Sequence, residues 1–155
     1  MPIDEQRFEY VGFWARAWAS FIDSVLSLFI VVPIVTAVYG GRYWLDPSLI
    51  KGPVDLLVTY VLPAVAVIAF WMARQATPGK MLIHARIVDA ESGGKPSSGQ
   101  MIGRYFAYYL SIFGLFLGFL WVVWDRRKQG WHDKLAGTVV IRERRPGPGS
   151  AGAQK

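Results

Sequence analysis

Residues 13–39 read FWARAWASFIDSVLSLFIVVPIVTAVY, an apolar run interrupted by Arg16 and Asp23. The run is longer than the roughly 20 residues that a helix needs to cross a bilayer. A carboxylate in the middle of such a helix costs about 2.5–3.5 kcal/mol, so Asp23 is expected to face protein or water rather than lipid. Arg16 lies seven residues earlier, close to two helical turns, which places both charges on one helix face. This face is the first candidate functional surface, with Arg16 expected to be an anchor or a partner for Asp23.

The composition points to the same class of protein. The chain has 155 residues, which fits one domain, and 53% of them are hydrophobic against 18% charged. The hydrophobic residues are grouped in long runs, as in membrane spans. The net charge of +6 lies beside these runs, so the expected partner is anionic lipid and not nucleic acid. The absence of cysteine excludes disulfides, thiolate metal sites and a cysteine nucleophile.

We predict an all-α integral membrane protein with a polar leader (1–12), a membrane domain (13–145) and a disordered tail (146–155). Its two full transmembrane helices cover residues 13–39 and 54–73. A third apolar helical segment, residues 101–124, is interrupted only by Arg104. Apolar and polar residues alternate over 81–88, and a second strand candidate is Thr138–Glu143. One strand alone is marginally stable, so these two are expected to pair as a small cytoplasmic element.

The distribution of Lys and Arg predicts the topology. Residues 40–53 contain two, residues 74–100 contain four, and the chain from residue 125 onward contains eight. The positive-inside rule therefore places the N-terminus, the second loop and the tail in the cytoplasm and the first loop outside. Three simple crossings cannot do this. Either residues 101–124 form a re-entrant hairpin broken near Gly114, which we favour, or they span and the tail is exported against its charge.

Several motifs in combination resemble the RDD family of small bacterial membrane proteins. They are Arg16, Asp23, the turn ATPGK (76–80) followed by RIVD (86–89), and the closing stretch WDRRKQGWHDKLAGT (124–138). The family takes its name from one arginine and two aspartates. Arg16 and Asp23 look like the first two, and Asp133 is a better candidate than Asp125 for the third. The resemblance implies a multi-pass protein of the bacterial cytoplasmic (inner) membrane, with a transport role and cation/proton exchange suggested for some members.

Two functions are compatible with these charges. In the first, a small transporter or channel-like subunit binds a proton or monovalent cation at Asp23, assisted by Arg16 and Asp133. Two or three helices enclose too little space for a solute path, so such a subunit is expected to form a homo-oligomer. In the second, a non-transporting scaffold or accessory subunit uses the same charges to fix helix packing, and its basic cytoplasmic face binds lipid or a partner protein.

Secondary candidates have structural explanations beside the functional ones. Asp55, at the mouth of the second span, would gather cations or cap a helix. Arg104 would reach the acidic face or, as we expect, snorkel to the membrane surface. His132 beside Asp133 suggests a catalytic dyad, but no nucleophile stands at a recognisable spacing, so a structural hinge is expected. We therefore predict no enzyme activity.

The remaining predictions concern a basic cluster, metal sites and cofactors. Arg126, Arg127 and Lys128 follow the third apolar segment and are expected to contact lipid headgroups. The two histidines are far apart and cysteine is missing, so no metal site is expected. No phosphate loop or dinucleotide motif occurs, so no cofactor is expected.

Overall fold

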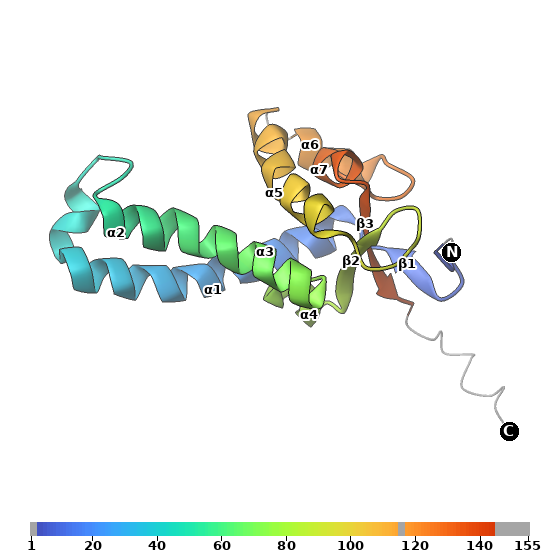
Figure 1. The fold of residues 1–155 in the computed structure, drawn as a ribbon, viewed down its shortest axis with the longest axis horizontal. Coiled ribbons are helices and arrows are strands. Elements are labelled where there is room, and N and C mark those ends of the chain that lie inside the picture. Colours follow the sequence, from blue (N-terminus) through green and yellow to red (C-terminus); the bar gives the residue numbers. More distant parts are fainter. Residues whose placement is uncertain (1–2, 115–116, 145–155) are drawn as a thin grey trace, which may run out of the picture.

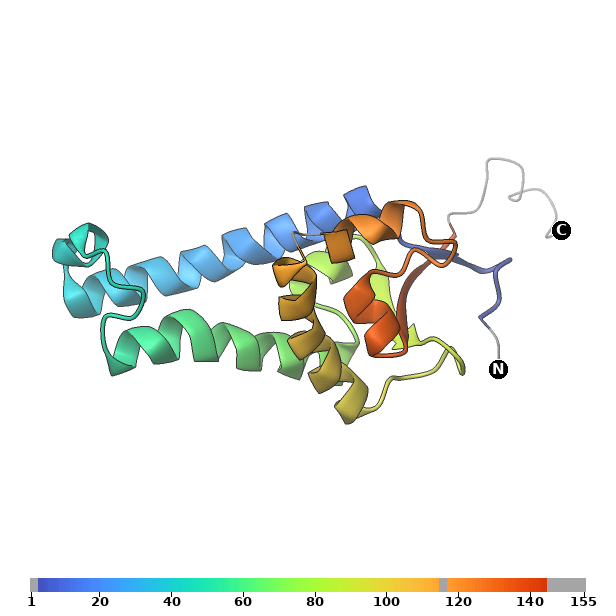
Figure 2. The ribbon, with the colours of Figure 1, turned by 90° about the horizontal axis from the view of Figure 1, so that it is seen from above.

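Two long apolar helices extend from a compact end that contains a small sheet (Figure 1). The computed structural model describes residues 3–114 and 117–144. The first long helix is α1 (Phe13–Tyr39). The second, Pro53–Arg74, consists of α2 (Pro53–Asp55), a π-helical turn (Leu56–Val61) and α3 (Leu62–Arg74). The two helices lie side by side in both ribbon views (Figures 1 and 2).

Both long helices are apolar on faces that the protein leaves uncovered. Their most apolar windows have mean hydropathies of 2.3 and 2.2, with only 6% and 11% of those residues buried. A helix that is apolar all round and not buried in protein suits lipid. Within the described chain, two helices are therefore long and apolar enough to cross a membrane, at the two places predicted.

The third apolar segment is a bent pair of helices. Helix α5 (Ser98–Phe113) begins at a capping box formed by Ser97 and Gln100 and ends at Gly114. Helix α6 (Leu117–Leu120) continues into a short 3-10 helix (Trp121–Val123). This second part, Leu117–Val123, lies at 112° to α5. The break predicted near Gly114 is confirmed. A pair bent this sharply fits a broken span or a re-entrant loop.

The sheet has three strands where two were predicted, so the all-α description is also too narrow. Strand β3 (Thr138–Glu143) lies between β1 (Phe8–Tyr10) and β2 (Ala85–Asp89), antiparallel to both. The additional strand, β1, comes from the polar leader. Phe8 and Tyr10 pack on the cluster that contains Val139 and Ile141, so burying these rings favours pairing along the free edge of β3.

The alternation over residues 81–88 predicts a strand that starts too early. Residues Pro78–Leu82 form the short helix α4, and β2 begins only at Ala85. Pro78 occupies the first turn of α4, where its missing N–H and fixed φ favour a helix. His84, with φ of 56°, then turns the chain into the strand.

The sheet gathers three parts of the chain at one end of the long helices. The leader, the segment after α3 and the segment before the tail all contribute strands there, while the loop 40–53 lies at the opposite end (Figures 1 and 2). This is the arrangement that the Lys and Arg counts require. The tail predicted to be disordered, 146–155, lies outside the described residues.

Helix α4 packs against α1 through a glycine. A Cβ built on Gly79 would lie 2.0 Å from the carbonyl oxygen of Ala19, a backbone atom that cannot move aside. We expect Gly79→Ala to destabilise the protein by about 1–3 kcal/mol, because overpacking separates α4 from α1. Gly103→Ala is the matched control, since a Cβ at Gly103 would meet nothing within 4 Å and alanine favours a helix interior. Equal melting temperatures for the two variants in detergent would contradict this packing.

Candidate functional site

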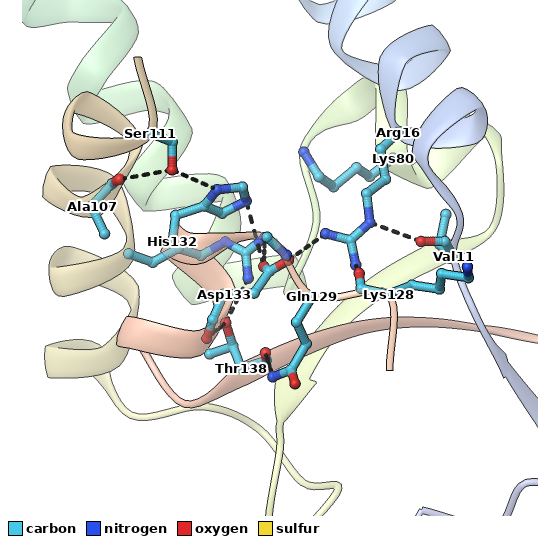
Figure 3. Close-up of polar contacts among 12 residues, drawn as sticks. Val11, Arg16, Lys80, Ala107, Ser111, Lys128, Gln129, His132, Asp133 and Thr138 are labelled. Atoms are coloured by element: carbon cyan, nitrogen blue, oxygen red, sulfur yellow. Dashed lines mark hydrogen bonds and ion pairs between the residues drawn. The ribbon is translucent and has the colours of Figure 1, made fainter. Parts of the chain in front are cut away.

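Arg16, in the first turn of α1, uses its guanidinium to hold the C-terminal part of the chain (Figure 3). Its Nε donates to the carbonyl oxygen of Val11 at 2.9 Å, and Nη2 donates to that of Lys128 at 2.6 Å. Its Nη1 donates to the carboxylate of Asp133. The arginine thus ties the start of the first long helix to residues more than 110 positions later in the chain.

Asp133 is the centre of the site. It lies in the first turn of α7 (Trp131–Leu135), and its side chain is 0% exposed. Oδ2 accepts a hydrogen bond from the Gly130 N–H at 2.9 Å, and Oδ1 lies 2.5 Å from Nη2 of Arg104. Burial alone would raise the pKa of the Asp133 carboxyl, but the charges of Arg104 and Arg16 outweigh it and hold that pKa well below its usual range. The carboxylate therefore stays ionised between two guanidinium groups.

Arg104 is buried, so the expectation that it snorkels to the membrane surface is wrong. Its side chain is 0% exposed, and Nη1 donates to the Thr138 hydroxyl at 2.6 Å. The guanidinium also lies over the ring of Trp71, 5.4 Å from its centroid. Its contact with Asp133 is an ion pair rather than a well-aligned hydrogen bond. Arg104 can remain inside because Asp133 supplies the counter-charge that a buried guanidinium needs.

His132 lies between Ser111 and Asp133, in an order that resembles a serine hydrolase triad. The Ser111 hydroxyl is 3.3 Å from Nδ1, but Nε2 is 3.6 Å from Oδ1 of Asp133, too far for a hydrogen bond. Ser111 is 0% exposed and also donates to the carbonyl oxygen of Ala107. The imidazole stacks on Tyr108, with centroids 4.1 Å apart. The buried hydroxyl and this stacking give His132 the contacts of a packed core residue.

Asp23 belongs to a separate group of contacts. Its Oδ2 accepts from the Thr77 hydroxyl at 2.5 Å, and its Oδ1 accepts from the Gly79 N–H at 2.7 Å. These donors lie at the N-terminus of α4, where backbone N–H groups lack helical partners. Asp23 thus fastens α4 to α1. The predicted partnership between Arg16 and Asp23 is absent from the described residues, because Arg16 pairs with Asp133.

The other acidic candidates lie apart from the Asp133 site. Asp55, at the far end of the long helices, is 1% exposed and accepts from the hydroxyls of Tyr43 and Thr59 at 2.7 and 2.8 Å. It fixes the loop to the second helix. Asp125 forms an ion pair with Lys134 at 2.5 Å, outside the cluster around Asp133.

Two members of the basic cluster already bond to the protein. Arg127 donates to the carbonyl oxygen of Ala90 at 3.0 Å, and Lys128 donates to that of Val123 at 2.9 Å. Arg126 is exposed and makes no hydrogen bond or ion pair within the described ranges. Since carbonyl oxygens carry no net charge, all three residues of the cluster keep a positive charge without an ion pair in the described part of the chain.

Lys80 belongs to the site although sequence reasoning did not single it out. Its side chain is buried, and together with Arg16 and Arg104 it lines a cavity of about 430 Å³ beside the start of α1. The turn ATPGK (76–80) is the sequence feature that could have indicated Lys80. Thr77 and Gly79 of this turn donate hydrogen bonds to Asp23, and Lys80 lines the cavity. A lysine after a turn is ordinarily exposed, so its burial here depends on tertiary packing.

Burial of His132 predicts a loss of stability in mild acid. Burial, only partly offset by Asp133, lowers the pKa of His132 to about 3. The unfolded chain, with a histidine pKa near 6.5, therefore binds more protons than the folded chain between these values. Stability should fall as the pH drops from 6.5, by at most about 1.4 kcal/mol per pH unit from this group.

The measurement is the free energy of unfolding between pH 7 and 5 for the wild type and His132→Gln. The variant should show a flatter dependence over this range, whatever its absolute stability. Equal slopes for the wild type and His132→Gln would show that His132 is not held neutral by burial.

Comparisons with known proteins identify three relatives of this chain. The chain is 30% identical over 148 residues to "Uncharacterized protein YxaI" of Bacillus subtilis, covering 84% of this chain and 95% of that protein. It is 24% identical over 148 residues to "Uncharacterized membrane protein YteJ" of the same organism, covering 87% and 82%. A third relative, "Uncharacterized protein RP437" of Rickettsia prowazekii, is 37% identical over 75 residues, covering 48% and 41%.

No solved structure matches the chain. The family model described as the RDD family matches residues 10–137. The match contains Arg16, Asp23 and Asp133 and runs from the last residue of β1 to the residue before β3. With most of its length covered by that match, the chain belongs to the RDD family, as its motifs predicted.

Proposed function

We propose that this membrane protein is a non-transporting scaffold or accessory subunit. Its two long helices anchor it, and its buried charges fix those helices to a compact cap formed by the sheet, α5 and α7. The cap carries the basic residues that would bind anionic lipid or a partner protein. The observation that carries this proposal is that Arg16, Asp23 and Asp133 are all occupied by bonds within the protein.

The contacts of these charges are those of packing groups. Asp133 bonds to two arginines from α1 and α5, so three segments meet at one carboxylate. Asp23 accepts two hydrogen bonds from the turn that starts α4. Such hydrogen bonds and ion pairs stabilise the ionised carboxylate. Their stabilisation is lost when the carboxylate takes up a proton or gives up its donors to bind a cation. This cost favours a structural role for both aspartates.

The positive-inside rule gives the proposed orientation. The basic segments 74–100 and 125–144 lie at the sheet end, with the leader, so this end and the N-terminus would face the cytoplasm. The protein would be a multi-pass protein of the bacterial cytoplasmic membrane. The bent pair of α5 and α6 would then enter the membrane from the cytoplasmic side without crossing it.

Cation or proton transport is the second candidate, and one observation favours it. Asp23 lines two cavities, one of about 150 Å³ beside α3 and one of about 330 Å³ beside α5. Both cavities also include Val67 and Thr77, so they adjoin on the face of α1 that meets α3. A transporter built on this acid would require a homo-oligomer, because the two long helices alone enclose no continuous solute path.

A flux assay in liposomes separates the two candidates. We expect the wild type to dissipate proton, Na⁺, K⁺ or Li⁺ gradients no faster than vesicles without protein. Asp23→Asn should lower stability by about 1–3 kcal/mol, because the single amide oxygen can accept from only one of Thr77 and Gly79 and the NH2 group cannot accept from the other. The melting temperature of the purified protein measures this effect.

Glu91→Gln is the matched control, since Glu91 is exposed and should leave the melting temperature unchanged. The scaffold proposal is overturned by cation-dependent flux that disappears in Asp23→Asn while that variant keeps wild-type stability. That result would place the transported ion at Asp23.

A further inference from the structure

One cavity combines buried cations with apolar walls. It has a volume of about 430 Å³ and lies between the start of α1 and helices α5, α6 and α7. Most of its surface is carbon, supplied by side chains such as Phe13, Leu120 and Val122. Arg16, Lys80, Arg104 and His132 line it as well, and none of its described lining residues carries a carboxylate. A volume of this size accommodates a small ligand or a lipid headgroup.

Lys80 is the cation without a partner of its own. It is 5% exposed, and across the described ranges no carboxylate lies within ion-pairing distance of its Nζ. Its one hydrogen bond runs to the Thr77 hydroxyl, at 3.4 Å. Arg104 adds an unused donor, because its buried Nε has no acceptor among the described atoms. Buried cationic donors of this kind require an acceptor or a counter-ion.

With both nearby carboxylates, Asp133 and Asp23, counted, the charges around the cavity leave one positive charge uncompensated. Arg16, Lys80 and Arg104 contribute three cations. Asp133 neutralises one of them directly, and Asp23 reaches Lys80 only through the Thr77 hydroxyl. His132 is neutral at pH 7, because its burial lowers its pKa to about 3. The cavity is therefore suited to a ligand with a single negative charge, such as a phosphodiester.

The position of the cavity favours a lipid over a free ion. Trp14 and Trp18 on α1 are 78% and 64% exposed, and Trp121 and Trp124 beyond α6 are 44% and 71% exposed. Exposed tryptophans of this kind mark the level of lipid headgroups in a membrane. A hydrated inorganic anion gains little binding energy from carbon walls. The glycerol and first methylenes of a lipid are stabilised by contact with such walls.

We propose that this cavity is a binding site for one anionic phospholipid, with the phosphodiester held by Lys80, Arg104 and Arg16. Figure 3 shows the Lys80 side chain beside Arg16 and His132, and all three residues line the cavity together with Arg104. The acyl chains leave along the apolar start of α1. This site is distinct from the exposed cluster Arg126, Arg127 and Lys128. The inference rests on the proposed function only in placing this end of α1 at a membrane surface.

The test uses the purified full chain in a neutral detergent. The probes are phosphatidylglycerol, phosphatidylcholine with the same acyl chains, and inorganic phosphate, with melting temperature and native mass spectrometry as readouts. Phosphatidylglycerol should raise the wild-type melting temperature by several degrees and remain bound at one molecule per chain. Phosphatidylcholine and inorganic phosphate should give less than a third of that rise.

Variants locate the site. Lys80→Met should bind phosphatidylglycerol at least tenfold more weakly while melting no earlier than the wild type without lipid, because it removes an unpaired buried charge. Lys80→Arg keeps the charge and should bind within threefold of the wild type. The control Lys95→Met, at an exposed position, should bind normally, and Arg126→Met tests the exposed basic cluster as the alternative site.

Three results would overturn the proposal. These are an equal rise with phosphatidylcholine, an equal rise with inorganic phosphate, and binding that Arg126→Met loses but Lys80→Met keeps. If Lys80→Met does not fold, the three wild-type probes and Lys80→Arg decide the question. Ion flux in liposomes would overturn the scaffold proposal without affecting the lipid preference measured here, so the two failures are distinguishable.

Discussion

The fold depends on one buried carboxylate held between two guanidinium groups. Asp133 has no exposed surface and meets Arg16 from α1 on one side and Arg104 from α5 on the other. Each of these charges would be unfavourable inside the protein without the others. Their contact therefore requires that α1, α5 and α7 pack together, and the sheet closes around the same junction through the bond from Arg104 to Thr138.

A second, separate contact fixes the first long helix to the segment that leads into the sheet. Asp23 binds the N-terminus of α4, which leads directly into strand β2. The first long helix thus carries two fastening points, Arg16 near its start and Asp23 two turns further along. Asp23 and Asp133 thus serve two different junctions of the fold.

Local properties of the sequence predicted a large part of this structure. Hydropathy predicted the two long helices. Residue type and charge predicted the break near Gly114, and the Lys and Arg counts predicted that the strands lie at one end of the helices. The contacts between distant residues were not predictable, because Arg16 and Asp133 are 117 positions apart. The burial of Arg104 and the pairing of the leader as β1 depend on those contacts, and a period-2 pattern could not distinguish α4 from a strand.

The most direct test of this account is a double-mutant cycle on the contact between Arg16 and Asp133. The free energy of unfolding in mixed micelles is measured for Arg16→Gln, Asp133→Asn and the double variant. Asp133→Asn leaves both arginines without their counter-charge, whereas Arg16→Gln leaves Asp133 paired with Arg104 alone. Because the two changes disrupt the same contact, we expect the losses to be non-additive by about 2–4 kcal/mol. Losses that add within about 0.5 kcal/mol would show that this ion pair does not hold α1 to the cap.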